Sequence, residues 1–284
     1  MSIGWYPGHM HKARKDITEA LQQVDAVLEI VDARLPYASE NPLLNKLIGT
    51  KPRLRILNKG DLADPTVSQR WLAHYAAQGI ACQLFEKDDA AGLKALLRRA
   101  TATLERKASR PNRLMIVGIP NVGKSTLINL LAGRKIAKVG DEPAVTKSRQ
   151  EIKLTDDLVL YDTPGILWPK LEDQQAAYRL AASGAIRNTA IELGDVGLFA
   201  LELLQQRYPQ AIQQRYGVDP AGQTPLALLE AIGRKRGALS KAGVDFTKVG
   251  EVVINDLRTG KLGLISLETP EDIPPPTEPQ MMEE

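Results

Sequence analysis

Residues 118–125 have the pattern of a phosphate-binding loop. They read GIPNVGKS, fit GxxxxGK[ST], and lie between an apolar run and a helical pattern, the context in which backbone N–H groups cradle phosphates. Lys124 is predicted to be a catalytic charge partner of the terminal phosphates, and the Ser125 hydroxyl is predicted to ligate Mg²⁺. The predicted nucleotide-binding residues of this segment are Asn121, Val122, Gly123, Lys124, Ser125 and Thr126.

A second motif, DTPG at 162–165, ends another apolar run. An aspartate in that position holds Mg²⁺ through a water molecule, and the backbone N–H of Gly165 can contact the third phosphate of a nucleoside triphosphate. DTPG alone is compatible with any turn. Following a phosphate loop, it predicts that Asp162 belongs to a metal and nucleotide site.

A third motif, NKGD at 58–61, selects the base. The carboxylate of Asp61 can accept two hydrogen bonds from guanine, N1–H and N2–H₂, which adenine does not offer, and an unpaired carboxylate is strongly disfavoured. Asn58 and Lys59 are assigned to the same base site. The three motifs together predict a protein that binds GTP and GDP and hydrolyses GTP.

The order of these motifs is unusual, because most GTPases place the phosphate loop before NKxD. Buried strand patterns alternate with helical ones, which favours a mostly parallel sheet covered by helices. A domain whose termini lie close together can be cut elsewhere and rejoined. The predicted fold is therefore α/β, a circularly permuted Ras-like P-loop domain over residues 1–172. Its predicted strands are 26–33, 53–58, 80–85, 113–118 and 158–162.

A different pattern begins near residue 173. Residues 173–269 contain amphipathic helical stretches, with helix starts at Thr224 and Asp245 and stops at Gly237 and Gly260. This predicts a smaller helical domain. The acidic, proline-rich end at 270–284 is predicted to be disordered.

Composition excludes several classes of protein. The net charge of +3 is only mildly basic, and no apolar run is long enough for a secretion signal or a membrane span. The one cysteine, Cys82, cannot form an internal disulfide, and its neighbours predict a small core residue. We expect a cytoplasmic protein, monomeric and without a membrane partner.

Five segments together resemble ribosome biogenesis GTPase A, the YlqF type of circularly permuted GTPase: 5–14 (WYPGHMHKAR), 32–36 (DARLP), 58–61 (NKGD), 118–125 (GIPNVGKS) and 162–170 (DTPGILWPK). The resemblance implies a factor that acts late in assembly of the large (50S) ribosomal subunit, contacts its rRNA, and switches with GTP. It also implies that Thr146 closes over Mg²⁺ and the third phosphate as a catalytic switch residue.

The chain departs from other GTPases in two places. The Ser-Ala-Lys-like loop that usually supports guanine reads LFEKDD at 84–89, where Lys87 alone could keep a stacking role. The glutamine that often orients water is replaced by Ile166, so hydrolysis must use another group. One candidate is a K⁺ ion held by Asn121, although asparagine is also a common turn residue. Another is His9, which could activate water or contact phosphate or rRNA instead.

RNA binding is expected in the second domain. Basic helices are often only solvated faces, but the resemblance favours RNA phosphate contacts with strong salt dependence. The alternative to an enzymatic switch is an RNA-binding module in which GTP only sets affinity. The basic residues considered are Arg234, Lys235, Arg236, Lys241, Lys248, Arg258 and Lys261.

Overall fold

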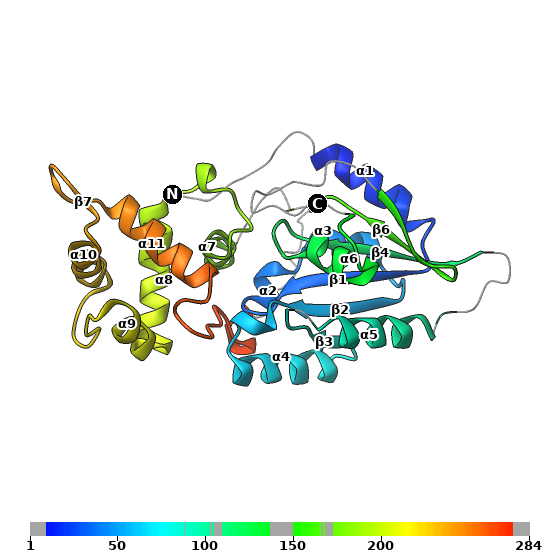
Figure 1. Ribbon diagram of the computed structural model, residues 1–284, viewed down its shortest axis with the longest axis horizontal. Coiled ribbons are helices and arrows are strands. Elements are labelled where there is room, and N and C mark those ends of the chain that lie inside the picture. The colour runs from blue at the N-terminus through cyan, green and yellow to red at the C-terminus, as the bar shows by residue number, and fades with distance from the viewer. Residues whose placement is uncertain are drawn as a thin grey trace, which may run out of the picture.

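The computed structural model describes residues 10–87, 89–102, 104, 110–136, 150–165, 167 and 173–274 (Figure 1). A six-stranded sheet lies at one end of the molecule, and a group of helices lies at the other (Figure 1). The strand order is β3-β2-β1-β4-β6-β5, and every neighbouring pair is parallel except β5–β6. The strands are β1 (Ala26–Asp32), β2 (Arg53–Asn58), β3 (Cys82–Leu84), β4 (Asn112–Gly118), β5 (Gln150–Thr155) and β6 (Leu158–Asp162).

Helices bury both faces of this sheet. Val31 and its neighbours on one face pack against Trp71 of α4 (Pro65–Ala77). Ile30, one residue earlier, points to the other face and shares a core with Leu93 of α5 (Ala90–Ala102). Burial on both sides explains why β1 is an unbroken apolar run apart from Glu29 and Asp32, as is typical of central parallel strands.

The strand order confirms the α/β fold and its permutation. The strand that ends in NKGD, β2, precedes the strand that leads into the phosphate loop, β4, and β1 lies between them in the sheet. Asp32 and Asn58 are register partners, and Ile30 is opposite Gly118. The carboxyl ends of these three strands therefore meet at one edge, although their motifs are far apart in the chain.

Some elements were not predicted. Two short helices, α2 (Pro36–Ser39) and α3 (Pro42–Ile48), each begin with a proline, and the Asn41 side chain caps α3. The edge strand β5 alternates charged and apolar residues and pairs antiparallel with β6. The other helices of this half are α1 (Met10–Leu21) and α6 (Lys124–Ala132).

The helical part begins at α7, where Asp173 caps the first turn. Thr224 and Asp245 cap α10 and α11 as expected, and Gly237 ends α10 in a left-handed conformation. The helices α8 and α11 cross closely: a Cβ at Gly197 would lie 2.4 Å from the Cα of Gly250. The elements are α7 (Gln174–Ser183), α8 (Leu193–Arg207), α9 (Pro209–Tyr216), α10 (Pro225–Arg236), the hairpin β7–β8 (Leu239–Ser240, Gly243–Val244) and α11 (Phe246–Arg258).

The chain then runs back to the sheet through residues 262–274, here called the return segment. Its backbone N–H groups at Ile265 and Leu267 donate to Leu62 O (3.0 Å) and Arg34 O (2.7 Å). A short 3-10 helix (Pro270–Asp272) follows, in which Asp272 pairs with Arg207. The disorder expected from residue 270 therefore does not hold for residues 270–274, because these ion pairs and backbone bonds anchor them. Residues 275–284 lie outside the described part.

A buried carboxyl group, Glu268, anchors the return segment. Its Oε1 accepts the N–H of Ala38 at 3.0 Å, and Oε2 lies 3.6 Å from Nη1 of Arg179 in α7. Burial raises the pKa of Glu268 to about 8, against the opposing effect of Arg179. One side chain thus joins α2, α7 and the return segment. No helix in the described parts of the chain is both long and apolar enough to span a membrane.

Candidate nucleotide-binding site

The guanine motif and the phosphate loop line one cavity of about 740 Å³ at the carboxyl edge of the sheet. Asn58 ends β2, and Lys59 and Asp61 follow it in the next loop. Gly123 and Thr126 come from the phosphate loop and the first turn of α6. Ligands of open α/β sheets bind at this edge because the loops that follow parallel strands converge there. The structure therefore brings together the two motifs that the sequence places far apart.

A direct hydrogen bond joins the two loops. Nδ2 of Asn58 donates to the carbonyl of Val122 at 2.7 Å. Gly123 lies against the same amide with φ of 99°, and a Cβ there would come within 2.1 Å of Nδ2. Both the positive φ and the close approach require glycine. Asn58 thus positions the phosphate loop relative to the guanine motif.

Lys124 is buried at the start of α6. Its Nζ donates to the carbonyls of Gly118 (3.0 Å) and Ile119 (2.8 Å) of its own loop. Burial lowers the pKa of Lys124 to about 8, and the negative charge of Asp162 opposes this shift. A buried ammonium group beside a helix N-terminus is suited to binding a phosphate anion.

The DTPG motif packs on the phosphate loop. Asp162 is buried at the end of β6 opposite Ile116, and the Thr163 hydroxyl donates to Ile116 O at 2.7 Å. A Cβ at Gly165 would lie 2.8 Å from Pro120 Cα, so only glycine allows this approach.

The donor set at this edge fits Mg²⁺. Hydroxyl and carboxylate oxygens of Ser125 and Asp162 are hard ligands, and Mg²⁺ in nucleotide sites usually has few protein ligands besides phosphates and water. Among the described residues, no group of three or more His, Cys, Asp or Glu side chains could form a metal cage of its own. This pair of oxygen donors could hold Mg²⁺ beside the phosphates.

The base side of the cavity is held by charged contacts. Lys59 has a left-handed backbone (φ 63°), and its Nζ donates to Oδ2 of Asp32 at 2.9 Å. Arg34 forms a second, bidentate contact with Asp32 at 2.9 and 2.8 Å. Burial alone would raise the pKa of Asp32, but the charges of Arg34 and Lys59 hold it well below the usual range. Oδ1 of Asp61 accepts the backbone N–H of Lys87 at 3.1 Å.

Of the remaining predicted residues, the structure describes Asn121 but not His9 or Thr146. Asn121 has a left-handed backbone (φ 55°), and its Nδ2 donates to the carbonyl of Gly184, just after α7, at 2.8 Å. The predicted residues His9 and Thr146, and Ile166 where a glutamine is usual, lie outside the described residues.

Sequence reasoning missed several residues that line the cavity. Lys87 was considered only for stacking. Arg258 was grouped with surface basic residues, because its position in the last turn of a helical stretch does not reveal which way it points. The missed lining residues are Leu62, Phe85, Asn129, Leu130, Arg134, Lys135, Arg258 and Thr259.

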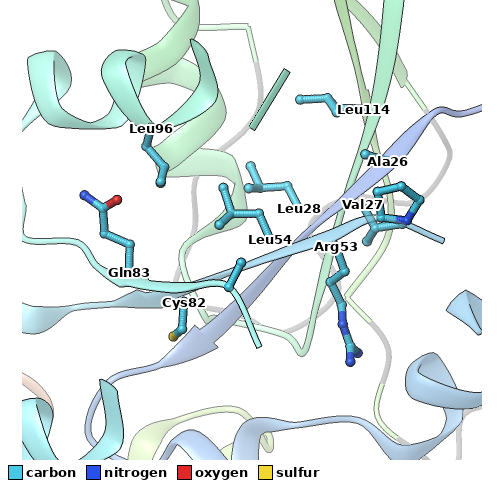
Figure 2. A pocket seen from close by; sticks show the side chains of 11 residues that line it. Ala26, Val27, Leu28, Arg53, Leu54, Cys82, Gln83, Leu96 and Leu114 are labelled. Atoms are coloured by element: carbon cyan, nitrogen blue, oxygen red, sulfur yellow. The ribbon is translucent and has the colours of Figure 1, made fainter. Parts of the chain in front are cut away.

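A second cavity, of about 360 Å³, lies at the amino ends of the central strands, opposite the nucleotide motifs (Figure 2). Its lining includes Ala26, Arg53 and Cys82, the first residues of β1, β2 and β3, together with Leu96 of α5. Cys82 is half-buried there rather than part of a closed core, and burial raises the pKa of its thiol to about 12. None of the nucleotide motifs reaches this edge.

Comparison with known proteins gives consistent matches. Residues 113–217 match the profile of a family described as a 50S ribosome-binding GTPase. The chain is 44% identical to Ribosome biogenesis GTPase A of Priestia megaterium, over 97% of this chain and 100% of that protein. A GDP-bound YlqF structure superposes with a TM-score of 0.69 at 28% identity, covering 90% of this chain and 99% of that one.

A second solved structure, GNP-bound YlqF from T. maritima, has a TM-score of 0.66 at 29% identity and covers 92% of this chain and 100% of that one. The likeness thus extends over the sheet, the helical part and the order of motifs. The chain is a GTPase and belongs to the ribosome biogenesis GTPase A family.

Proposed function

We propose that this GTPase is an assembly factor for the large (50S) ribosomal subunit, which binds rRNA through its helical part and switches with nucleotide state. The proposal is carried by the contact between the phosphate loop and α7: Asn121 donates to Gly184 at the carboxyl end of that helix. The segment after DTPG leads into the amino end of the same helix, which Asp173 caps. Changes at the phosphates could therefore reach the helical part at both ends of α7.

We assign the nucleotide roles to the residues of the three motifs, whose loops lie at the carboxyl ends of the central strands. Asp61 pairs with guanine. Asn58 and Lys59 support the loop at 58–64, here called the base loop. Lys124 binds the terminal phosphates, with the backbone of Val122, Gly123 and Thr126 and the N–H of Gly165. Ser125 ligates Mg²⁺ directly, and Asp162 holds it through water.

Hydrolysis requires a group other than a glutamine after DTPG, since that position is Ile166. We assign the switch contact to Mg²⁺ and the third phosphate to Thr146 and water activation to His9, both outside the described residues. K⁺ is a further cofactor candidate at Asn121. The NH₂ group of that amide donates to Gly184, whereas its carbonyl oxygen is the atom suited to K⁺.

The same proposal divides the chain into a permuted GTPase domain at 1–172, a helical RNA-binding domain at 173–269, and an acidic end at 270–284. The described part of that end belongs to the return segment, which ties the two domains together. We place the protein in the cytoplasm as a monomer.

RNA binding is supported by exposed basic and aromatic residues of the helical part. The last turn of α10 exposes Arg234, Lys235 and Arg236, and Lys241 follows at the tip of the β7–β8 hairpin. Phe246, at the start of α11, is 40% exposed and could stack on an unpaired base. Phosphate contacts from such a surface are independent of sequence and weaken with salt.

Co-sedimentation tests this function. The protein would be mixed with purified 50S or 30S particles in GDP, in GTP, and in a non-hydrolysable GTP analogue. We expect it to sediment with 50S in the analogue and to be released in GDP, with no binding to 30S. Equal binding in all three states would favour an RNA-binding module in which GTP turnover is incidental.

Single-turnover hydrolysis tests the enzymatic switch. An activating partner that completes a GTPase site can contribute about 10³–10⁵-fold in rate. We expect 50S particles to stimulate hydrolysis well beyond about tenfold, and 30S particles to have no effect. His9→Ala should reduce the stimulated rate and leave nucleotide affinity unchanged. A fully active variant would remove His9 from the mechanism but leave ribosome activation in place.

A further inference from the structure

We propose that Arg258, in the last turn of α11, is a nucleotide-binding residue contributed by the helical part, and that its guanidinium contacts the diphosphate shared by GDP and GTP. This rests on the nucleotide site proposed above. It makes nucleotide affinity depend on a residue outside the GTPase sheet.

The position of Arg258 is the first observation. Arg258 and Thr259 line the same cavity as Lys59, Asp61 and Gly123, so the end of α11 forms one wall of it. The guanidinium also lies beside the carbonyl partner of the phosphate loop, because a Cβ at Gly184 would be 3.2 Å from Nε of Arg258. It therefore lies in the wall of the cavity, beside the residue of the helical part that the phosphate loop contacts.

Its anchoring is the second observation. Nε and Nη2 donate to the carbonyls of Ala182 (3.0 Å) and Ala181 (2.8 Å), and Nη1 donates to Oδ1 of Asn188 (3.1 Å). The partly negative carboxyl end of α7 thus holds the cation in place. These three contacts use three of the five N–H groups of a guanidinium. The side chain is oriented in advance with donors left for a ligand.

Its charge environment is the third observation. In the described residues Arg258 makes no ion pair with a carboxylate, whereas Arg179, Arg207, Arg215 and Arg234 of the same region each do. Burial and the positive charge of Arg34 lower the pKa of Arg258 to about 10. The charge of Arg258 in turn contributes to lowering the pKa of Lys59. The charged side chains that act on Arg258 are thus cations.

A partly buried cation next to other cations is stabilised by an anion. Within this cavity, the diphosphate is the anion that both nucleotides would supply.

The competing explanation is that Arg258 only fixes α7 to α11. A matched control separates the two roles. Arg207 also joins the helical part to a distant segment, through Asp272 at 2.8 Å, but it does not line the cavity. Loosening the helical part should affect Arg207→Ala and Arg258→Ala alike, whereas loss of a ligand contact should affect only the second.

The experiment compares the full-length wild type, Arg258→Ala, Arg258→Lys and Arg207→Ala. Dissociation constants for GDP and GTP are measured by titration of a fluorescent analogue, and that for guanosine by its displacement. A hydrogen bond to a charged group is strong enough that Arg258→Ala should weaken GDP and GTP equally, by about tenfold or more. Guanosine should be affected by less than about twofold, and Arg258→Lys should recover part of the loss because it keeps the charge.

Wild-type GDP affinity in Arg258→Ala would overturn the proposal. So would an equal loss in Arg207→Ala, or an equal loss for guanosine, since either result would assign the effect to structure. Failure of the nucleotide site itself has a different signature, namely GDP binding by the wild type that is insensitive to Lys124→Ala.

Discussion

The base end and the phosphate end of the nucleotide cavity are connected to the helical part in different ways. The base loop is held by Asp32, which accepts a hydrogen bond from Lys59, and by the return segment. In that segment the N–H of Ile265 donates to Leu62 O, and the Ser266 hydroxyl accepts the N–H of Asp64. The phosphate loop reaches the helical part through the Asn121 side chain, which donates a hydrogen bond to the carbonyl of Gly184.

Backbone bonds and buried ion pairs keep a loop in one conformation, whereas a side-chain hydrogen bond can be exchanged at small free-energy cost. The loop proposed to recognise the base is thus held in place before nucleotide binds. In the proposed function, the contact at the phosphates is the one that nucleotide or a ribosomal partner alters. The predictions below test this contrast.

Lys124→Ala should have the largest effect. Removing the buried ammonium group from the phosphate end should weaken GDP and GTP binding by at least about 100-fold, because charge-assisted bonds to phosphate are lost. The melting temperature without nucleotide should stay within a few degrees, since the base end is anchored independently. Calorimetric titration and a thermal scan measure both, with exposed Lys153→Ala as the control. Normal GDP affinity would refute the assignment of the phosphate end.

Asp61→Asn changes the base end instead. The amide can still accept the N–H of Lys87, but it no longer offers guanine two acceptor oxygens. We expect GTP affinity to fall about 10- to 100-fold and xanthosine nucleotides to be preferred. Competition binding with GTP, XTP and ATP measures this preference. An unchanged order of affinities would mean that Asp61 does not contact the base.

Glu268 links the anchoring of the base end to pH. Its pKa in the folded protein is about 8 against an ordinary value of 4.5, so between these values the folded chain binds a proton that the unfolded chain has released. Stability from this group is complete below the unfolded pKa and is lost as pH rises toward 8, by up to about 1.4 kcal/mol per pH unit.

Urea unfolding from pH 5 to 8 measures this dependence. Glu268→Gln keeps the shape and should give a flatter profile than the wild type, and other titrating groups cancel in the difference. Parallel profiles would contradict burial of an ionisable group at this junction.

Asn121→Ser should have the smallest effect on binding and a selective one on hydrolysis. The shorter side chain cannot keep both the bond to Gly184 and a carbonyl oxygen for K⁺. We expect GDP affinity to change by less than about fivefold, the scale of one neutral hydrogen bond. The difference in hydrolysis rate between K⁺ and Na⁺ buffers should disappear. A wild type that hydrolyses GTP equally in both buffers would exclude K⁺ at this site.

Much of the fold could be predicted because its signals are local. The strand patterns at 26–33 and 113–118, the caps at Thr224 and Asp245 and the stop at Gly237 depend on neighbours in the chain, and the structure contains the corresponding elements. The edge strand β5 and the short helices α2 and α3 were missed. Their patterns are weak, and they are stabilised by pairing with β6 and by caps such as Asn41.

What the amino-acid order alone determined is the chemistry: GxxxxGKS, DTPG and NKGD require particular groups at particular spacings, and their permuted order can be seen without coordinates. Only the tertiary structure decided which surroundings these groups have. Asp32 beneath Lys59, Glu268 on Ala38, and Arg258 in the wall of the cavity are contacts between segments far apart in the chain. A charged residue at the end of a helix looks the same in the sequence whether it faces solvent or a cavity, because its direction depends on how whole elements pack.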